Sequence, residues 1–252
     1  MRVDGCVALV TGGNRGLGAV FARMLLERGA RRVYSGARDP GSITGAGVVP
    51  VRLDITEPGQ VADAAERCSD VTLLVNNAGV LADSPLLAAP TEAAARAEME
   101  VNYFGTLAMC RAFAPVLARN GGGALVNVLS IASFFTNPAM GSYAASKAAA
   151  WALTNGARVE LRGQGTQVVA VHSGYIDTDM AADVTAPKAS PETVVATTLD
   201  ALETGAEEVL ADERTRQIKA AVPTDLDTIY PGIQSMWDRR SPRQPTLPNP
   251  TG

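Results

Sequence analysis

The chain contains 252 residues, which is enough for one α/β domain with a well-buried core, so a second domain is not required. Hydrophobic residues make up 46% and charged residues 19%, a balance typical of globular proteins that argues against disorder. The net charge of −4 and the lack of a Lys/Arg-rich run argue against nucleic acid as a partner.

In chain order, short β-branched runs alternate with longer patterns of helical periodicity. Strands are expected at Cys6–Val10, Arg32–Ser35, Val48–Leu53, Val71–Val75, Ala124–Leu129, Gln167–His172 and Glu208–Leu210. Helices are expected from Leu17 to a stop at Gly29, and at Glu57–Cys68, Thr91–Ala118, Ser142–Leu161, Pro191–Leu202 and Asp212–Ala221. This alternation predicts one Rossmann-type, doubly wound parallel sheet of about seven strands with helices on both faces.

Two stretches depart from the alternation. The segment between Val33 and Val49 is short and Gly-rich, which leaves little room for a helix, so this crossover is expected to be a loop. Ser241–Gly252 carries four prolines and no apolar pattern, and is expected to be a mobile tail. Residues 1–240 are then the expected domain.

Cysteine usage and hydropathy favour a cytoplasmic protein without a membrane or metal partner. Cys6, Cys68 and Cys110 are scattered and form no CxxC pair or zinc spacing, as expected for a reduced compartment. The start of the chain has no pattern of a signal peptide. The uncharged stretch Asn120–Ser146 is broken by Asn, Ser, Thr and Gly, which argues against a membrane span.

A glycine-rich turn follows the first expected strand. The run Thr11–Gly18 reads TGGNRGLG, with the spacing GxxxGxG rather than the commoner GxGxxG. Between a strand and an amphipathic helix, such a turn lets backbone N–H groups and the helix N-terminus bind a pyrophosphate. The alternative is a tight turn without a ligand. The candidate cofactor contacts in this turn are Gly12, Asn14, Arg15, Gly16 and Leu17.

The residue after the second strand favours NADP(H) over NAD(H). NAD sites usually place an acidic residue there to hold the ribose hydroxyls, whereas a nearby arginine accepts the 2′-phosphate of NADP. Arg38 occupies this place and Arg15 lies in the turn, although Asp39 follows Arg38 and complicates the assignment. The alternative is a pair of solvated surface arginines.

Five motifs in order resemble the short-chain dehydrogenase/reductase family over roughly residues 5 to 180. They are Thr11–Gly18, Asn76-Asn77-Ala78-Gly79, Asn102, Ser130 and Tyr143-Ala144-Ala145-Ser146-Lys147. The resemblance implies a nicotinamide cofactor and a homodimer or homotetramer built through the two long central helices. It also implies cofactor contacts at Asp54, Ile55, Asn76, Ala78, Gly79, Gly174, Ile176 and Thr178, in addition to Tyr143 and Lys147. Asp54 could instead cap the following helix, and Asn76 could close a turn.

One position departs from the family pattern. The family usually has Pro-Gly after the sixth strand, and this chain has Ser173-Gly174. Because proline fixes one backbone angle, the loop that seats the nicotinamide is expected to be less rigid here.

Tyr143 and Lys147 are one helical turn apart, so both side chains share a face of their helix. A phenol with an ordinary pKa of about 10 is a poor proton donor or acceptor at neutral pH. A nearby ammonium favours the phenolate and lowers that pKa. The expected chemistry is hydride transfer between the nicotinamide and a carbonyl or secondary alcohol, with Tyr143 as general acid/base.

Ser130 and Asn102 complete the expected catalytic set. Ser130 follows a strand end, where its hydroxyl would donate to the carbonyl oxygen as that oxygen gains charge. By resemblance, Asn102 anchors a water that relays protons to Lys147. The alternatives are a capping serine and a helix asparagine bonded to the backbone.

The substrate is expected to be a small carbonyl or alcohol compound. Candidate pocket residues, with core packing as the alternative, are Ile131, Phe134, Phe135, Met140 and Tyr175. The segment Asp179–Ser190, which would cover the pocket, is brief, and this suggests an open cleft. The single histidine, His172, and the absence of a GxSxG elbow argue against a Ser-His-Asp hydrolase.

Two other functions are compatible with these motifs. The chain could bind NADP(H) as a sensor or scaffold without turnover, or catalyse epimerisation or dehydration through a transient ketone. Tight NADPH binding without turnover would indicate the sensor. Product formation without net cofactor consumption would indicate an epimerase or dehydratase.

Overall fold

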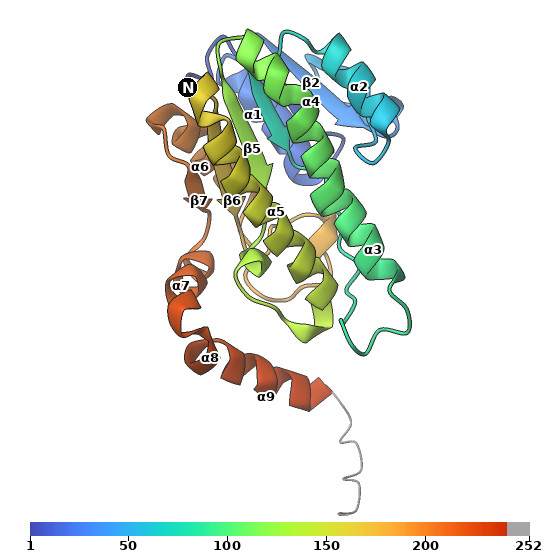
Figure 1. Ribbon diagram of the computed structural model, residues 1–252, viewed down its shortest axis with the longest axis vertical. Coiled ribbons are helices and arrows are strands. Elements are labelled where there is room, and N and C mark those ends of the chain that lie inside the picture. Colours follow the sequence, from blue (N-terminus) through green and yellow to red (C-terminus); the bar gives the residue numbers. More distant parts are fainter. Residues whose placement is uncertain (241–252) are drawn as a thin grey trace, which may run out of the picture.

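The computed structural model describes residues 1–240 as a single parallel sheet flanked by helices (Figure 1). The strand order is β3-β2-β1-β4-β5-β6-β7, and every neighbouring pair is parallel. The strands are β1 (Val7–Thr11), β2 (Arg32–Ala37), β3 (Val48–Arg52), β4 (Leu73–Asn76), β5 (Ala124–Val128), β6 (Gln167–His172) and β7 (Glu208–Leu210). The predicted doubly wound α/β fold is confirmed.

The helices cover both faces of the sheet. They are α1 (Gly16–Glu27), α2 (Pro58–Arg67), α3 (Ala93–Met99), α4 (Thr106–Arg119), α5 (Gly141–Glu160), α6 (Pro191–Thr204), α7 (Glu213–Ala221), α8 (Asp225–Thr228) and α9 (Tyr230–Arg240). In Figure 1, α4 and α5 lie in front of the sheet. None of the helices within residues 1–240 is both long and apolar enough to cross a membrane.

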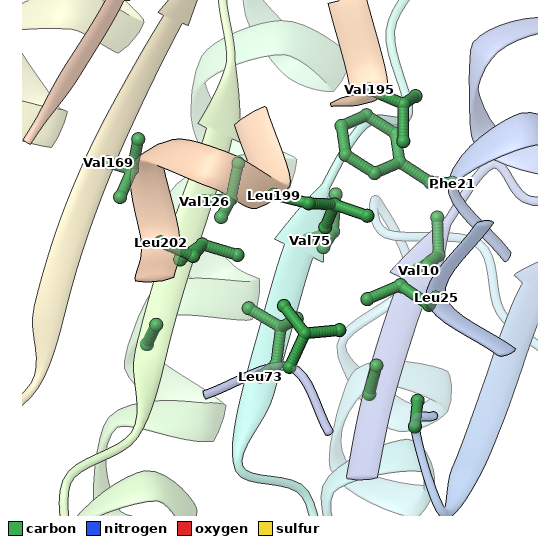
Figure 2. Close-up of a cluster of buried hydrophobic side chains, with 14 of the residues drawn as sticks. Val10, Phe21, Leu25, Leu73, Val75, Val126, Val169, Val195, Leu199 and Leu202 are labelled. Atoms are coloured by element: carbon green, nitrogen blue, oxygen red, sulfur yellow. The ribbon is translucent and has the colours of Figure 1, made fainter. Parts of the chain in front are cut away.

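Side-chain alternation along the central strands builds a separate core on each face. In β4, Leu73 and Val75 point toward α1 and α6, whereas Leu74 points toward α2, α4 and α5. Figure 2 shows the first cluster, in which Phe21 of α1 and Leu199 of α6 pack over these strands. Each such fully buried side chain stabilises the fold by about 1.5–3 kcal/mol relative to its exposed state.

The crossover between β2 and β3 is a loop, as predicted. It holds only one 3₁₀ turn, Pro40–Ser42, in which the Asp39 side chain accepts from the N–H of Gly41. A cavity of about 330 Å³ lies beside this crossover, between α1 and residues 43–48, and reaches Gly13 and Asn14 of the glycine-rich turn.

The prediction of one continuous helix over Thr91–Ala118 is wrong in its middle. A π-helical segment, Glu100–Gly105, separates α3 from α4. Gly105 packs directly against Ile55, where any Cβ would collide with that side chain. π-helical bulges occur frequently at functional sites, and this one contains Asn102.

The chain beyond Ala221 continues as helix, where the sequence pattern predicted no element. The turn Val222–Thr224 leads into α8 and α9, and Ile229 and Ile233 are buried. The N–H of Thr136 lies 3.4 Å from the hydroxyl of Tyr230, so α9 contacts the segment that follows Ser130. The tail predicted for Ser241–Gly252 lies outside the described residues.

Candidate active site

The glycine-rich turn between β1 and α1 is shaped by backbone conformations and close contacts. Gly12 and Gly16 have positive φ angles of 63° and 52°, which L side chains rarely adopt. A Cβ on Gly12 would lie 3.1 Å from Cα of Ala78. Within residues 1–240 no side chain caps the start of α1, so its first N–H groups face the turn. This cradle fits the pyrophosphate of a dinucleotide.

Thr11 and Asn77, which the sequence analysis did not single out for a role of their own, hold this turn. The Thr11 hydroxyl accepts hydrogen bonds from the N–H groups of Asn77 and Ala78, both at 3.0 Å. The Asn77 amide donates to the carbonyl oxygens of Thr11 (3.0 Å) and Gly12 (3.2 Å). The predicted contact residue Ala78 therefore lies against the turn.

The three charged residues that bear on NADP selection have different surroundings. Arg15 is exposed and forms an ion pair with Asp179 at 3.3 Å. Asp39 accepts a hydrogen bond from the N–H of Gly41 at 2.9 Å, so its carboxylate caps the crossover turn. Arg38 lies beyond the end of β2 and is one of the groups that lower the pKa of Asp54. Asp39, which complicated the assignment, thus has a structural role.

Asp54 and Ile55 lie after β3 in a turn stabilised by side chains. Burial acts to raise the pKa of Asp54, but hydrogen bonds from the N–H and hydroxyl of Thr56, at 3.0 and 2.7 Å, lower it overall. Ile55 is buried against Gly105. The structure therefore places Ile55 beside the π-helical segment that carries Asn102.

Asn76 lies in the interior rather than facing the turn. Its side chain is buried and donates to Oδ1 of Asn127 at 2.9 Å and to the thiol of Cys110 at 3.5 Å. Any contact with a cofactor would have to use its backbone. Gly79, by contrast, lies against two candidate catalytic residues. A Cβ on Gly79 would be 3.1 Å from Oδ1 of Asn102 and 3.5 Å from Nζ of Lys147.

Helix α5 carries Tyr143 and Lys147 on one face, as their spacing predicts. The Lys147 ammonium lies 5.7 Å from the centre of the Tyr143 ring and donates to the carbonyl oxygen of Val128 at 3.0 Å. Burial lowers the pKa of Lys147 to about 8. A lysine with this pKa exchanges protons readily near neutral pH.

The expected lowering of the Tyr143 pKa by Lys147 is wrong for the described state. Burial raises the pKa of Tyr143 to about 12; the Ser130 hydroxyl acts in the opposite direction, and the buried Glu98 raises it further. The free-energy cost of removing a phenolate from water exceeds the stabilisation that the Ser130 hydroxyl provides. The phenol is therefore protonated over the physiological pH range.

Ser130 and Asn102 lie near Tyr143 and Lys147. Ser130 follows β5, and Asn102 lies in the π-helical segment. The Ser130 hydroxyl accepts from the N–H of Ala132 at 3.1 Å, which leaves its own O–H for donation. The Asn102 amide exchanges two 2.9 Å hydrogen bonds with the backbone of Val80 and donates to the hydroxyl of Ser146 at 2.9 Å. Asn102 thus ties the loop after β4 to α5.

The predicted substrate residues separate into two groups. Ile131 and Phe135 after β5, Tyr175 after β6 and Met140 before α5 are half-buried. Phe134 is buried, with its ring stacked 4.2 Å from His172 and edge-on to Trp151 at 5.0 Å. The ring of Phe134 thus completes a buried aromatic cluster, which agrees with the alternative of core packing.

The segment after β6 contains the remaining predicted cofactor residues. Ile176 pairs with Ala189 in an isolated parallel bridge, which draws the ends of the brief covering segment together. Thr178 lies beside the glycine-rich turn, 3.5 Å from where a Cβ on Gly16 would be. Gly174 bonds to Asp212, a residue for which the sequence analysis predicted no role beyond the start of a helix.

Comparisons with known proteins agree with this geometry. The sequence profile of the family described as short chain dehydrogenase matches residues 6–189. A crystal structure of a short chain dehydrogenase from Burkholderia cenocepacia J2315 in complex with NADP matches with a TM-score of 0.88 and 48% identity, covering 92% of this chain and 99% of that chain.

Curated proteins give the same match at lower identity. The 3-oxoacyl-(acyl-carrier-protein) reductase FabG of Vibrio cholerae is 31% identical over 189 residues, which is 71% of this chain and 77% of that protein. Sorbitol dehydrogenase of Cereibacter sphaeroides is 33% identical over 187 residues, which is 70% of this chain and 73% of that protein. Both relatives are named for oxidoreductase activities.

Proposed function

Because this chain belongs to the short-chain dehydrogenase/reductase family of NAD(P)-dependent oxidoreductases, we propose that it reduces a small carbonyl compound, or oxidises the matching secondary alcohol, with NADP(H). The observation that carries this proposal is the approach of Ser130, Tyr143 and Lys147 to one another at the end of the sheet that holds the glycine-rich cradle. NADPH, when bound, supplies the hydride.

We assign the proton chemistry to Tyr143. In reduction its hydroxyl protonates the carbonyl oxygen, and in oxidation its phenolate removes the proton of the alcohol. The high pKa of the half-buried phenol favours the proton-donating role at neutral pH. The Ser130 hydroxyl donates to the same substrate oxygen, and a donor fixed in this way stabilises the charge that develops there.

Lys147 and Asn102 would support this exchange. With a pKa of about 8, Lys147 is suited to return a proton to Tyr143 after each turnover. Gly79 lies against both Lys147 and Asn102, and the lack of a side chain there leaves room for the nicotinamide ribose. We propose that the water relay implied by the family resemblance starts at Asn102 and ends at Lys147.

We propose that Arg38 and Arg15 select NADP(H) over NAD(H). The carboxylate of Asp39, which would repel a 2′-phosphate, is directed to the N–H of Gly41 in the crossover turn. A similar protein of 48% identity carries NADP in its crystal structure. Guanidinium groups bind phosphate through charge-assisted, often bidentate hydrogen bonds.

We also propose a cytoplasmic homodimer or homotetramer. Cys6, Cys68 and Cys110 are free and buried, as in a reducing compartment. Phe104 and Val159 are 50% and 75% exposed on the two long central helical stretches, and large apolar side chains at such positions favour burial against a second copy. Sedimentation velocity tests this, and a monomer at micromolar concentration would contradict it.

A parallel screen tests the proposed function. A panel of ketones and aldehydes is mixed with NADPH and, separately, with NADH, and loss of the reduced nicotinamide is followed together with product formation. Consumption of NADPH matched by alcohol product is the expected result. Tight NADPH binding without turnover, or product formed without net NADPH consumption, would contradict it in favour of a sensor or an epimerase.

A further inference from the structure

The turn after β6 connects the two ends of the candidate site. At its start, the N–H of Ile131, next to Ser130, donates to the carbonyl oxygen of Ser173 at 2.8 Å. At its end, Asp179 pairs with Arg15 of the glycine-rich turn at 3.3 Å. A dinucleotide that reaches from the glycine-rich turn to Ser130 must therefore lie along residues 173–179.

Asp212 holds the first part of this turn. Its Oδ2 accepts hydrogen bonds from the N–H of Gly174 at 2.7 Å and from the hydroxyl of Ser173 at 3.4 Å. Its Oδ1 accepts from the N–H of Thr215 at 2.8 Å and thereby caps α7. Oδ2 also accepts from the hydroxyl of Thr215 at 2.8 Å. Oδ1 thus bonds to the helix start alone, whereas Oδ2 connects the helix start to the turn.

The electrostatics of Asp212 agree with this anchoring. Burial acts to raise the pKa of Asp212, but the hydrogen bonds from Gly174, Thr215 and Ser173 outweigh it and lower the pKa below its ordinary value. The carboxylate is consequently ionised at neutral pH, and a charged acceptor makes the stronger hydrogen bond.

This anchor lies outside the part of the chain that the family profile matches, which ends at residue 189. It also lies opposite Ser173, where the family usually has a proline that fixes one backbone angle. We propose that Asp212 is a positioning residue that replaces this proline, holding the Ser173–Gly174 turn in place for the nicotinamide half of the cofactor. The inference rests on the proposed function, because it assigns the turn to an NADP(H) site.

Substitution of Asp212 by asparagine separates its two roles. Asparagine is a good helix cap, so its amide oxygen still accepts from Thr215. The amide nitrogen then faces the N–H of Gly174, where two donors cannot bond. We expect the dissociation constant for NADPH to rise about tenfold, in line with the loss of one hydrogen bond to a charged group. Adenosine 2′,5′-bisphosphate, which lacks the nicotinamide half and reaches only the glycine-rich turn and Arg38, should bind as in the wild type.

Two controls and a second variant make the test specific. Glu213→Gln removes a negative charge from the next position of the same helix end without touching the turn, and should leave both dissociation constants unchanged. Ser173→Ala removes only the 3.4 Å contact and should change NADPH affinity by less than about twofold. If Asp212→Asn does not fold, Asp212→Ser still caps α7 but is too short to reach Gly174, and should give the same result.

Hydrogen exchange gives a measurement that does not require the cofactor. The backbone amides of residues 173–178 should exchange about tenfold faster in Asp212→Asn than in the wild type, while α7 stays protected. Unchanged exchange together with unchanged NADPH affinity in the folded variant would overturn the inference, and so would an equal loss of affinity for both ligands. Failure of the wild type to bind NADPH would instead contradict the proposed function.

Discussion

The glycine-rich turn after β1 and the acid/base group around Tyr143 are held by different physical means. The turn depends on backbone: positive φ angles at Gly12 and Gly16, and N–H groups at the start of α1. The acid/base group depends on burial, which raises the pKa of Tyr143 to about 12 and lowers that of Lys147 to about 8. A larger side chain should therefore impair the glycine-rich turn, whereas loss of a polar atom should impair the acid/base group.

Removal of the Tyr143 hydroxyl should have the largest effect. Tyr143→Phe should lower kcat roughly 1,000-fold, because a general acid/base contributes about 10²–10⁴ in rate. The dissociation constant for NADPH should stay within about twofold, since the ring remains in place. Steady-state kinetics and a fluorescence titration with NADPH check both parts.

The matched control for this substitution is Tyr34→Phe. The Tyr34 hydroxyl bonds to Asp70 and Arg32, away from the site. This variant should turn over at the wild-type rate. Turnover retained in Tyr143→Phe would show that this residue does not transfer the proton. It would also show that loss of a polar atom does not impair this end of the site.

Bulk in the glycine-rich turn should have the next largest effect. Gly12→Val places a β-branched side chain at a φ of 63° and close to Ala78, so the dissociation constants for NADPH and adenosine 2′,5′-bisphosphate should both rise by about 100-fold. Gly59→Val is the control, because no atom lies within 4 Å of a Cβ at Gly59. Wild-type binding by Gly12→Val would show that this turn holds no phosphate.

Lowering the pH should destabilise the fold around Tyr143 through protonation of His172. Its ring lies 3.2 Å from the carbonyl oxygen of Ser130, and its Nε2 is 3.8 Å from Glu208 and has no hydrogen-bond partner within residues 1–240. Burial lowers the pKa of His172 to about 4, against the partly opposing effects of Ser130 and Glu208, and Lys219 lowers it further. Between pH 6.5 and 4 the unfolded chain therefore binds up to one more proton than the folded protein.

The free energy of unfolding should then fall by about 2 kcal/mol as the pH is lowered from 6.5 to 5. His172→Asn, which keeps a side-chain N–H for the Ser130 carbonyl, should abolish most of this dependence. Since His172 is the single histidine, urea titrations at a series of pH values isolate its contribution. The same slope in the variant would assign the acid sensitivity to carboxylates.

Removal of the Arg38 charge should have the smallest effect and should distinguish the two cofactors. Arg38→Gln should raise the dissociation constant for NADPH about tenfold and leave that for NADH unchanged, since only NADPH carries the 2′-phosphate. Arg52→Gln, an exposed arginine at the end of β3, is the control. An equal loss for both cofactors would argue against selection by Arg38.

The predicted strands agree closely with the structure. Gln167–His172 and Glu208–Leu210 have the predicted bounds. The first is almost entirely buried, and a buried parallel strand reads as a short apolar run whatever packs on it. The break in the predicted helix over Thr91–Ala118 could not be found this way. It arises where Gly105 meets Ile55 and where Asn102 bonds to Val80, two contacts between residues far apart in the chain.

The site shows the same division between local and distant contacts. The spacing of Tyr143 and Lys147 places them together, since one helical turn separates them. Nothing in the spacing showed that Phe134 packs on His172 or that Asn76 bonds to Asn127. Asp212 was expected only to begin a helix, and the structure shows that its second oxygen reaches Gly174.

The sequence by itself determined the parallel α/β architecture, the glycine-rich turn and the shared face of Tyr143 and Lys147. Each of these follows from neighbours in the chain, through apolar periodicity, backbone freedom at glycine and helical geometry. Only the tertiary structure decided the raised pKa of Tyr143 and the anchoring of Gly174. Burial and hydrogen bonding between distant segments control both, and neither exists until the sheet brings those segments together.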